Sequence, residues 1–91
     1  MWYIYILKCV DKSYYVGVSA DLRGRLKIHN EGKGPNYTRV RRPVELVYFE
    51  EVSNKESAEI REIEIKKFGR KNKEYLIKHG TGVRGSLATK I

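Results

Sequence analysis

The sequence predicts an α+β fold with sandwich-like layering, in which a small three-stranded antiparallel sheet is flanked by helices in the order β–β–α–β–α–α. Two segments rich in aromatic and β-branched residues, 2–9 and 14–18, are separated by a polar turn and predict a hairpin. A third strand, 44–52, follows only after a helical segment. In this 91-residue chain we expect residues 1–80 to form one domain and 81–91 a flexible tail.

The first strand is predicted to lie in the middle of the sheet. Successive side chains of a strand point to opposite faces, and here both faces are apolar or aromatic. The two sets are Trp2, Ile4 and Ile6 on one face and Tyr3, Tyr5 and Leu7 on the other. Only a strand covered on both sides buries both sets. The third strand is predicted to place Val44, Leu46 and Tyr48 on one face.

The first helix is predicted between the second and third strands. Ser19 or Asp21 can cap its N-terminus by accepting a hydrogen bond from a backbone N–H. The helix runs to about Asn30, and Gly32 is a suitable C-terminal stop. The segment that follows, up to Pro43, is predicted to be an irregular loop.

Two further helices are predicted after the third strand. Ser53 and Glu56 form an S-x-x-E capping box, which is typical of a helix N-terminus. This helix runs to about Phe68, and residues 72–79 form the next one. The chain therefore supplies enough helix to cover both faces of the predicted sheet.

Composition limits the classes of function. Lys and Arg total 19 against 11 Asp and Glu, a net charge of +8, which favours a nucleic acid as partner over an anionic membrane surface. No apolar run approaches the roughly 20 residues of a membrane span. The single cysteine, Cys9, excludes an intrachain disulfide and a cysteine-based zinc site. We expect a cytoplasmic protein that can also associate with the nucleoid.

A glycine motif near the C-terminus does not indicate dinucleotide binding. Residues 80–85 spell G-x-G-x-x-G. That fingerprint requires a strand before the glycines and a helix after them. Here a predicted helix precedes the motif and only six residues follow it. These glycines are interpreted as part of a flexible tail.

Several polar residues can be brought together by the predicted elements. Tyr5 and Tyr15 lie on the two strands of one hairpin, which can place both phenols on one face. Arg25 and His29 are neighbours one turn apart on the first helix. A carboxylate from the helix over residues 53–68 would complete a set suited to phosphodiester hydrolysis. The carboxylate binds Mg²⁺, the guanidinium stabilises the phosphoryl charge, and a phenol or imidazole positions or deprotonates water.

Each member of this set also has a purely structural interpretation. Arg25 can pair with Asp21, four residues earlier, and His29 can be a surface histidine held by a hydrogen bond. Helical periodicity does not choose the carboxylate. The candidates are Glu59, Glu62 and Glu64.

The triplets Tyr-Ile-Tyr at 3–5 and Tyr-Val-Gly at 15–17 resemble the paired signature of the GIY-YIG nuclease superfamily. The resemblance covers residues 2–78 and is specific to the small single-domain branch of the superfamily. It continues in order through Arg25, His29, and the segments 33–47 and 58–66.

This resemblance implies a three-stranded module that cleaves DNA phosphodiester bonds with one divalent ion per site, Mg²⁺ or Mn²⁺. By position, Tyr5 and Tyr15 are the signature phenols, one of which is the general base or orients the water. The resemblance likewise makes Arg25 the candidate phosphate clamp and His29 an auxiliary acid or base. It makes Glu62 the candidate metal ligand, and we count Glu62 among the expected catalytic residues.

The sequence departs from the family pattern in places. Tyr3 replaces the first glycine, and Val18 stands where some members carry lysine or a hydroxyl residue. Asn72 follows Glu62 by only ten residues, so the asparagine found later in many members has no assigned counterpart. No second DNA-binding domain is present, so we expect substrate selection from the module's own surface or from a protein partner.

Two basic regions are predicted to contact phosphates rather than bases. The first is Lys33, Arg39, Arg41 and Arg42, and the second is Lys66, Lys67, Arg70, Lys71 and Lys73. The helix dipole alone can explain the second region. The leading hypothesis is a metal-dependent DNA endonuclease that acts on structured or damaged DNA. The alternatives are an inactive nucleic-acid-binding module and a protein-interaction module with an aromatic surface.

Overall fold

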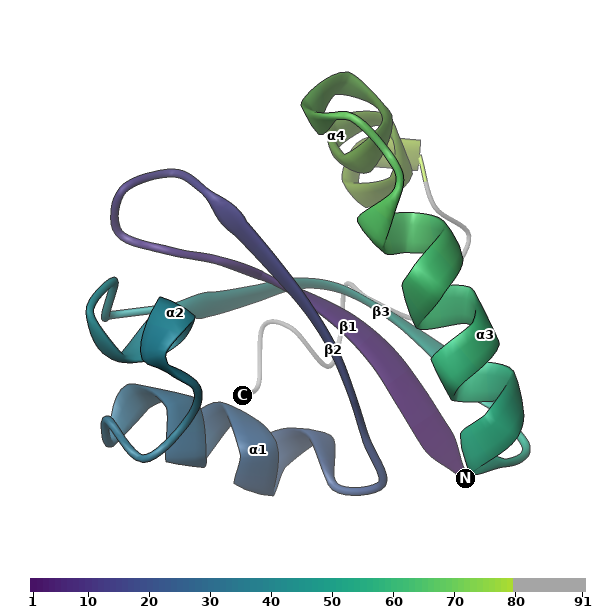
Figure 1. Cartoon of the computed structure of the whole chain (residues 1–91), viewed down its shortest axis with the longest axis horizontal. Helices are drawn as coiled ribbons and strands as arrows, with labels where there is room; N and C mark the ends of the chain where they lie inside the picture. The colour runs from purple at the N-terminus through teal and green to yellow at the C-terminus, as the bar shows by residue number, and fades with distance from the viewer. Residues whose placement is uncertain (80–91) are drawn as a thin grey trace.

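The computed structural model describes residues 1–79 and consists of a sheet between two helical layers (Figure 1). Helices α1 and α2 lie on one side of the sheet, and α3 and α4 lie on the other. The predicted α+β class is therefore confirmed. The elements are β1 (Trp2–Lys8), β2 (Tyr14–Ser19), α1 (Leu22–Asn30), α2 (Asn36–Arg39), β3 (Glu45–Val52), α3 (Lys55–Lys66) and α4 (Arg70–His79).

The order of elements differs from the prediction by one helix. The segment predicted as an irregular loop contains α2, a single turn that follows Pro35. Thr38 in this turn is fully buried. So short a helix has no apolar periodicity from which to predict it, and it depends on tertiary packing such as the burial of Thr38.

The sheet is antiparallel with the strand order β2–β1–β3, so β1 is central as predicted. Its alternating side chains divide the interior into two apolar clusters, one on each face. The cluster beneath α1 contains Tyr5, Leu7, Cys9, Leu22, Val44, Leu46 and Phe49. The cluster beneath α3 contains Ile4, Ile6, Val16, Tyr48, Ala58 and Ile65.

A register shift in β3 corrects one prediction. Ile6 pairs with Tyr48, whereas the next residue of β1, Leu7, pairs with Leu46. The extra residue, Val47, turns the strand over at this point. Leu46 therefore packs beneath α1 and Tyr48 beneath α3, so the shared face predicted for them is wrong.

The cap of α1 agrees with the prediction from the sequence, and the cap of α3 differs from it. Asp21 caps α1 through its side chain, and Gly32 follows the helix with a φ of +80°. At α3 the cap is Asn54, whose Oδ1 accepts from the N–H of Ser57 at 2.8 Å. The capping box predicted at Ser53 is therefore wrong by one residue, because the asparagine offers an equivalent oxygen one position later. Helix α3 ends, and α4 begins, slightly earlier than predicted.

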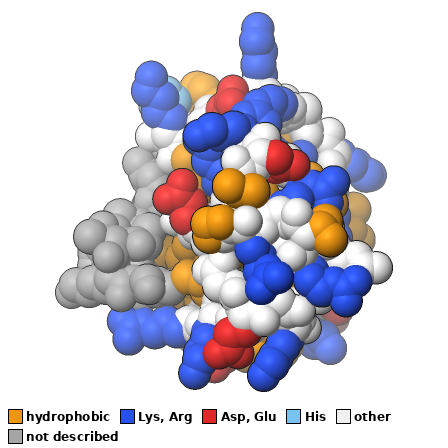
Figure 2. All heavy atoms as spheres, turned by 90° about the vertical axis from the view of Figure 1, so that its left-hand side faces the viewer, with side chains coloured by type: hydrophobic (Ala, Val, Ile, Leu, Met, Phe, Trp, Pro, Cys, Tyr) orange, Lys and Arg blue, Asp and Glu red, His pale blue; other side chains and the backbone are white. Residues whose placement is uncertain are grey.

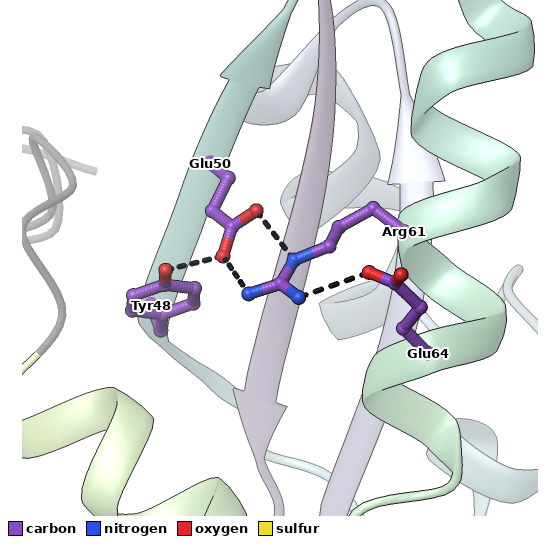
Figure 3. A network of polar contacts seen from close by, with 4 residues as sticks. All are labelled: Tyr48, Glu50, Arg61 and Glu64. Carbon is purple, nitrogen blue, oxygen red and sulfur yellow. Dashed lines mark hydrogen bonds and ion pairs between the residues drawn. The ribbon is translucent and has the colours of Figure 1, made fainter.

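A polar network fastens α3 to β3 (Figure 3). Arg61 donates two hydrogen bonds to the Glu50 carboxylate, both at 2.9 Å, and a third to Glu64 at 3.0 Å. The Tyr48 hydroxyl donates to the same Glu50 carboxylate. Burial acts to raise the pKa of Glu50, but the bonds from Arg61 and Tyr48 outweigh it and lower that pKa. This network sets the position of α3 against the sheet.

Cys9 lies at the end of β1, where the hairpin turn begins. Its side chain is buried in the cluster beneath α1, and its backbone N–H donates to Ser13 O at 2.8 Å. Arg41 ties the turn to the segment before β3 through an ion pair with Asp11 at 3.0 Å and a bond from the Val10 N–H to its carbonyl. No helix within residues 1–79 is both long and apolar enough to cross a membrane.

Candidate active site

A pocket of about 290 Å³ lies at the edge of the sheet formed by β2. All five residues predicted to be catalytic line it. They come from the two hairpin strands, from α1 and from α3, so both helical layers contribute. The lining residues are Tyr5, Tyr15, Gly17, Val18, Arg25, His29, Pro35 and Glu62.

Gly17 allows the Tyr5 phenol to lie across β2. The two residues are direct partners in the antiparallel pairing of β1 and β2. A Cβ on Gly17 would lie 2.5 Å from the Tyr5 hydroxyl oxygen and 3.1 Å from the Tyr15 ring. The absence of a side chain here is therefore what lets the phenol of a central strand reach a pocket at the edge.

The Tyr5 hydroxyl begins a chain of hydrogen bonds inside the α1 layer. Thr38 Oγ1 donates to the Pro35 carbonyl at 3.2 Å, so it accepts from His29 Nδ1 at 2.8 Å. His29 Nε2 is then left without a proton and accepts from the Tyr5 hydroxyl at 3.0 Å. The chain fixes one neutral tautomer of the imidazole.

Burial keeps both members of the Tyr5–His29 pair uncharged. It raises the pKa of Tyr5, assisted by Tyr15 and Glu62 and opposed by Arg25. It lowers the pKa of His29, and the nearby Arg25 charge lowers it further. His29 is 0% exposed, so it is an interior residue rather than a surface histidine.

Arg25 lies half-buried on the pocket wall. Among residues 1–79 it makes no ion pair. The Asp21 carboxylate, the partner considered from the sequence, instead accepts from the Gly24 N–H as the helix cap. A guanidinium that lines a polar pocket without an ion-pair partner is suited to binding an anion.

The structure distinguishes the three candidate glutamates. Glu62 lines the pocket, and its side chain is 19% exposed. Glu59 is exposed, and Glu64 is bound to Arg61. The Glu62 carboxylate lies 3.2 Å from Lys66 Nζ, one turn further along α3.

The donor set of the pocket suits one kind of metal ion. Within the described part of the chain, no three His, Cys, Asp or Glu side chains gather to hold a metal. Zinc would need three or four such ligands. Magnesium is commonly bound by one or two carboxylates and keeps several of its waters, so the single carboxylate of Glu62 in an open pocket fits Mg²⁺ or Mn²⁺.

Three neighbouring residues were not predicted from the sequence. Pro35 lines the pocket, and Thr38 orients His29. The Tyr37 ring lies 6.0 Å from the Tyr15 ring, with the Arg41 guanidinium 4.0 Å from its centre. A proline before a short polar segment is a helix-start signal, and it alone pointed to this turn.

The predicted basic residues divide into those with an acidic partner and those without one. Figure 2 shows Lys and Arg side chains over much of the face that lies to the left in Figure 1. Arg39, Arg42 and Lys67 have no acidic partner among residues 1–79. The engaged residues pair as Lys33 with Glu31, Arg41 with Asp11, Lys66 with Glu62 and Arg70 with Glu74. Asn72 is exposed on α4 and is not part of the pocket.

Comparison with known proteins identifies the family of the chain. The family model described as the GIY-YIG catalytic domain matches residues 1–75. The chain therefore belongs to the GIY-YIG family, a nuclease superfamily. The glycine motif at 80–85 and the tail predicted at 81–91 lie outside the described residues.

The chain is similar to small proteins named UPF0213. It is 49% identical to UPF0213 protein YazA of Bacillus subtilis, over 82% of this chain and 76% of that protein. It is 53% identical to UPF0213 protein CPE1444 of Clostridium perfringens, over 85% and 83%. The solution structure of UPF0213 protein BH0048 from Bacillus halodurans matches with a TM-score of 0.57 and 42% identity, over 91% and 89%.

Proposed function

We propose that this protein is a Mg²⁺- or Mn²⁺-dependent endonuclease that hydrolyses phosphodiester bonds in DNA. One observation carries the proposal: Tyr5, Tyr15, Arg25, His29 and Glu62 line a single pocket. The net charge of +8 supports an anionic polymer as substrate. We further propose that the enzyme acts in the cytoplasm, on nucleoid DNA.

Arg25 binds the phosphate that is cut. Its planar donors match phosphate oxygens, and its charge stabilises the additional negative charge of the transition state. Tyr15, half-buried on β2, offers the phenol that orients the attacking water. Tyr5 is 2% exposed and held by His29, so it forms a rigid polar wall rather than a mobile base.

Glu62 would hold the metal ion. A divalent ion there supplies Lewis acidity and lowers the pKa of bound water. Glu62 is suited to this task because Ala58 and Ile65, its neighbours on the same side of α3, are 0% exposed and fix the helix against the sheet. The carboxylate is therefore presented from a rigid element.

A cleavage assay tests the proposal. Labelled single-stranded, duplex, flap and branched DNA, together with RNA, are incubated with Mg²⁺, Mn²⁺ or EDTA. Glu62→Gln removes the charge with little change of shape, and Glu59→Gln, exposed on the same helix, is the matched control. We expect metal-dependent cutting that falls by about 10²–10⁴ in Glu62→Gln and is unchanged in Glu59→Gln.

Two results would overturn the proposal. Equal cutting with EDTA and with a metal ion would show that cleavage requires no metal. Equal cutting by Glu62→Gln and the wild type would show that Glu62 is not the metal ligand. A preference for RNA over every DNA would change the substrate and leave the chemistry in place.

A second candidate function is nucleic-acid binding without cleavage. The ion pair between Lys66 and the Glu62 carboxylate, at 3.2 Å, favours binding without cleavage, because it occupies the proposed metal ligand. Because Lys66 is 54% exposed, the pair is weak, and a metal ion together with DNA can displace it. If neither the wild type nor Lys66→Gln cuts any substrate while both bind DNA, this second function is correct.

A further inference from the structure

We propose that a groove beside the pocket binds a second phosphate of the same nucleic-acid strand, an inference that rests on the proposed function. The groove has a volume of about 740 Å³. It lies where α1, α2 and the start of β3 meet. Its lining residues are Asn30, Arg39, Val40, Arg42 and Pro43.

Arg42 is held in place with its terminal nitrogens free. Its Nε donates to the Arg39 carbonyl at 2.9 Å. Its guanidinium lies over Gly32, where a Cβ would come within 2.7 Å of Nη1. Within residues 1–79 the two terminal nitrogens donate to no other group. A guanidinium fixed at Nε and open at both Nη atoms is prepared for a phosphate oxygen pair.

Arg39 supplies the second charge of the groove. Its guanidinium donates to the Asn36 side chain and, within the described residues, has no carboxylate partner. Arg39 and Arg42 therefore bring two positive charges to one groove without a carboxylate partner among the described residues, and a bound phosphate would compensate both. The pair therefore favours an anion more strongly than a lone surface arginine does.

The walls of the groove are fixed before any ligand arrives. Asn30 donates to the Val44 carbonyl at 3.0 Å and accepts from the Val44 N–H at 2.8 Å. These two bonds join the end of α1 to the start of β3. Little ordering is then required on binding, which favours affinity.

The apolar lining indicates a nucleotide rather than a free anion. Val40 is 71% exposed and lies in the groove with Pro43. Free phosphate has no apolar surface to place against them. A sugar or base attached to the bound phosphate does, and it would remove that surface from water.

The groove and the pocket lie at opposite ends of α2. Pro35, just before the helix, lines the pocket, whereas Arg39 and Val40 line the groove. Four residues of helix rise about 6 Å, so the two sites are close enough for one strand to contact both. The groove would thus hold the strand in register while Arg25 binds the phosphate that is cut.

Arg41 provides the internal contrast. It lies next to Arg42 in the chain, but it is paired with Asp11 and packed on Tyr37. We expect its contribution to phosphate binding to be smaller than that of Arg42, because the Asp11 carboxylate partly compensates its charge.

Fluorescence anisotropy of a short labelled single-stranded DNA, with Glu62→Gln protein in EDTA, tests the groove without cleavage. In this background we expect Arg42→Gln to weaken binding by about 5–10-fold and to reduce the salt slope by about one. Arg42→Lys, which keeps the charge without the fork, should fall between. Arg23→Gln, at an exposed arginine of α1, should stay within about twofold.

If Arg42→Gln and Arg23→Gln weaken DNA binding equally, the proposal that the groove binds a second phosphate is wrong. Competition by inorganic phosphate as strong as that by a DNA trinucleotide would also overturn it, because the site would then bind a free anion. The proposed function is tested separately. If the wild type cleaves DNA and Arg42→Gln binds DNA as well as its parent protein, only the proposal for the groove is wrong. Arg42-dependent binding without cleavage overturns only the nuclease.

Discussion

Two tyrosine-centred polar networks lie on opposite faces of the sheet and end differently. Tyr5, beneath α1, donates to neutral His29, and the chain stops at a pocket with an unpaired Arg25. Tyr48, beneath α3, donates to Glu50, whose carboxylate is fully engaged by Arg61. Burial raises the pKa of both phenols.

The difference separates a network that borders the proposed site from a network that fastens α3 to the sheet. Around Glu50 every charge has a partner, so the network has no capacity left for a ligand and serves to hold α3 (Figure 3). Around Tyr5 the buried polar atoms are hydrogen-bonded, but the Arg25 guanidinium at the pocket has no ion-pair partner among residues 1–79. Charge left without a partner in a polar pocket is the physical signature of a site for an outside group.

The largest expected effect is on catalysis at the pocket arginine. Arg25→Gln should lower single-turnover cleavage by about 10²–10³, because a charge that stabilises the transition state is lost. The free energy of unfolding in urea should change by less than about 0.5 kcal/mol, since Arg25 makes no ion pair among residues 1–79. Arg23→Gln is the control and should match the wild type in both. A large loss of stability in Arg25→Gln would erase the contrast between the networks.

The reverse result is expected at the fastening arginine. Arg61→Gln should lower the free energy of unfolding by about 2–3 kcal/mol, because it leaves the Glu50 carboxylate without its partner. Cleavage measured well below the melting temperature should stay close to wild type. The double variant Glu50→Gln with Arg61→Gln should recover part of the stability, since no charge is then stranded. Lost cleavage in folded Arg61→Gln would mean that the two networks are coupled.

A smaller effect is expected at the residue that orients His29. Thr38→Val leaves the His29 Nδ1–H without an acceptor and should cost about 1–2 kcal/mol of stability. It should also change the imidazole tautomer seen in ¹⁵N NMR spectra, which a loss of packing alone would not do. Thr38→Ser keeps the hydroxyl and should restore the wild-type spectrum. An unchanged tautomer in Thr38→Val would contradict the assigned hydrogen-bond chain.

The mildest effect is a dependence of stability on pH. The folded pKa of His29 is lowered, so below about pH 6.5 the unfolded chain binds more protons than the folded one. The free energy of unfolding should therefore fall on acidification, by at most about 1.4 kcal/mol per pH unit. Urea unfolding between pH 7.5 and 5 measures it. His29→Gln should flatten this slope.

Most of the fold follows from local patterns in the sequence. Alternation predicted a central first strand, and the three strands and three longer helices were placed correctly. The shift at Val47 was not predictable, because it depends on which residues of β1 face β3 rather than on the sequence of β3. Helix α2 was missed because one turn carries no periodic signal.

The candidate site was predicted through the resemblance to a family more than through spacing. Periodicity left three glutamates open, and the structure brings only Glu62 to the pocket, since α3 passes the edge of β2 with that face toward it. The role of Thr38 could not be predicted, because its burial has meaning only with His29 packed beside it. Arg39 and Arg42 were expected to contact phosphate, but their separation from Arg41 needs the ion pair with Asp11.

The rate at which a thiol reagent labels Cys9 can report opening at the end of the hairpin. Cys9 is the chain's single thiol, and it is 3% exposed, so a thiol reagent reaches it more readily when the end of the hairpin opens. Burial also raises its pKa, which slows the reaction of the closed form further. Opening requires the turn to leave Arg41 and the segment beside α2. A strand of nucleic acid that lies across that segment would slow the labelling of Cys9. The labelling rate would therefore report the binding of an uncut nucleic acid that carries no probe of its own.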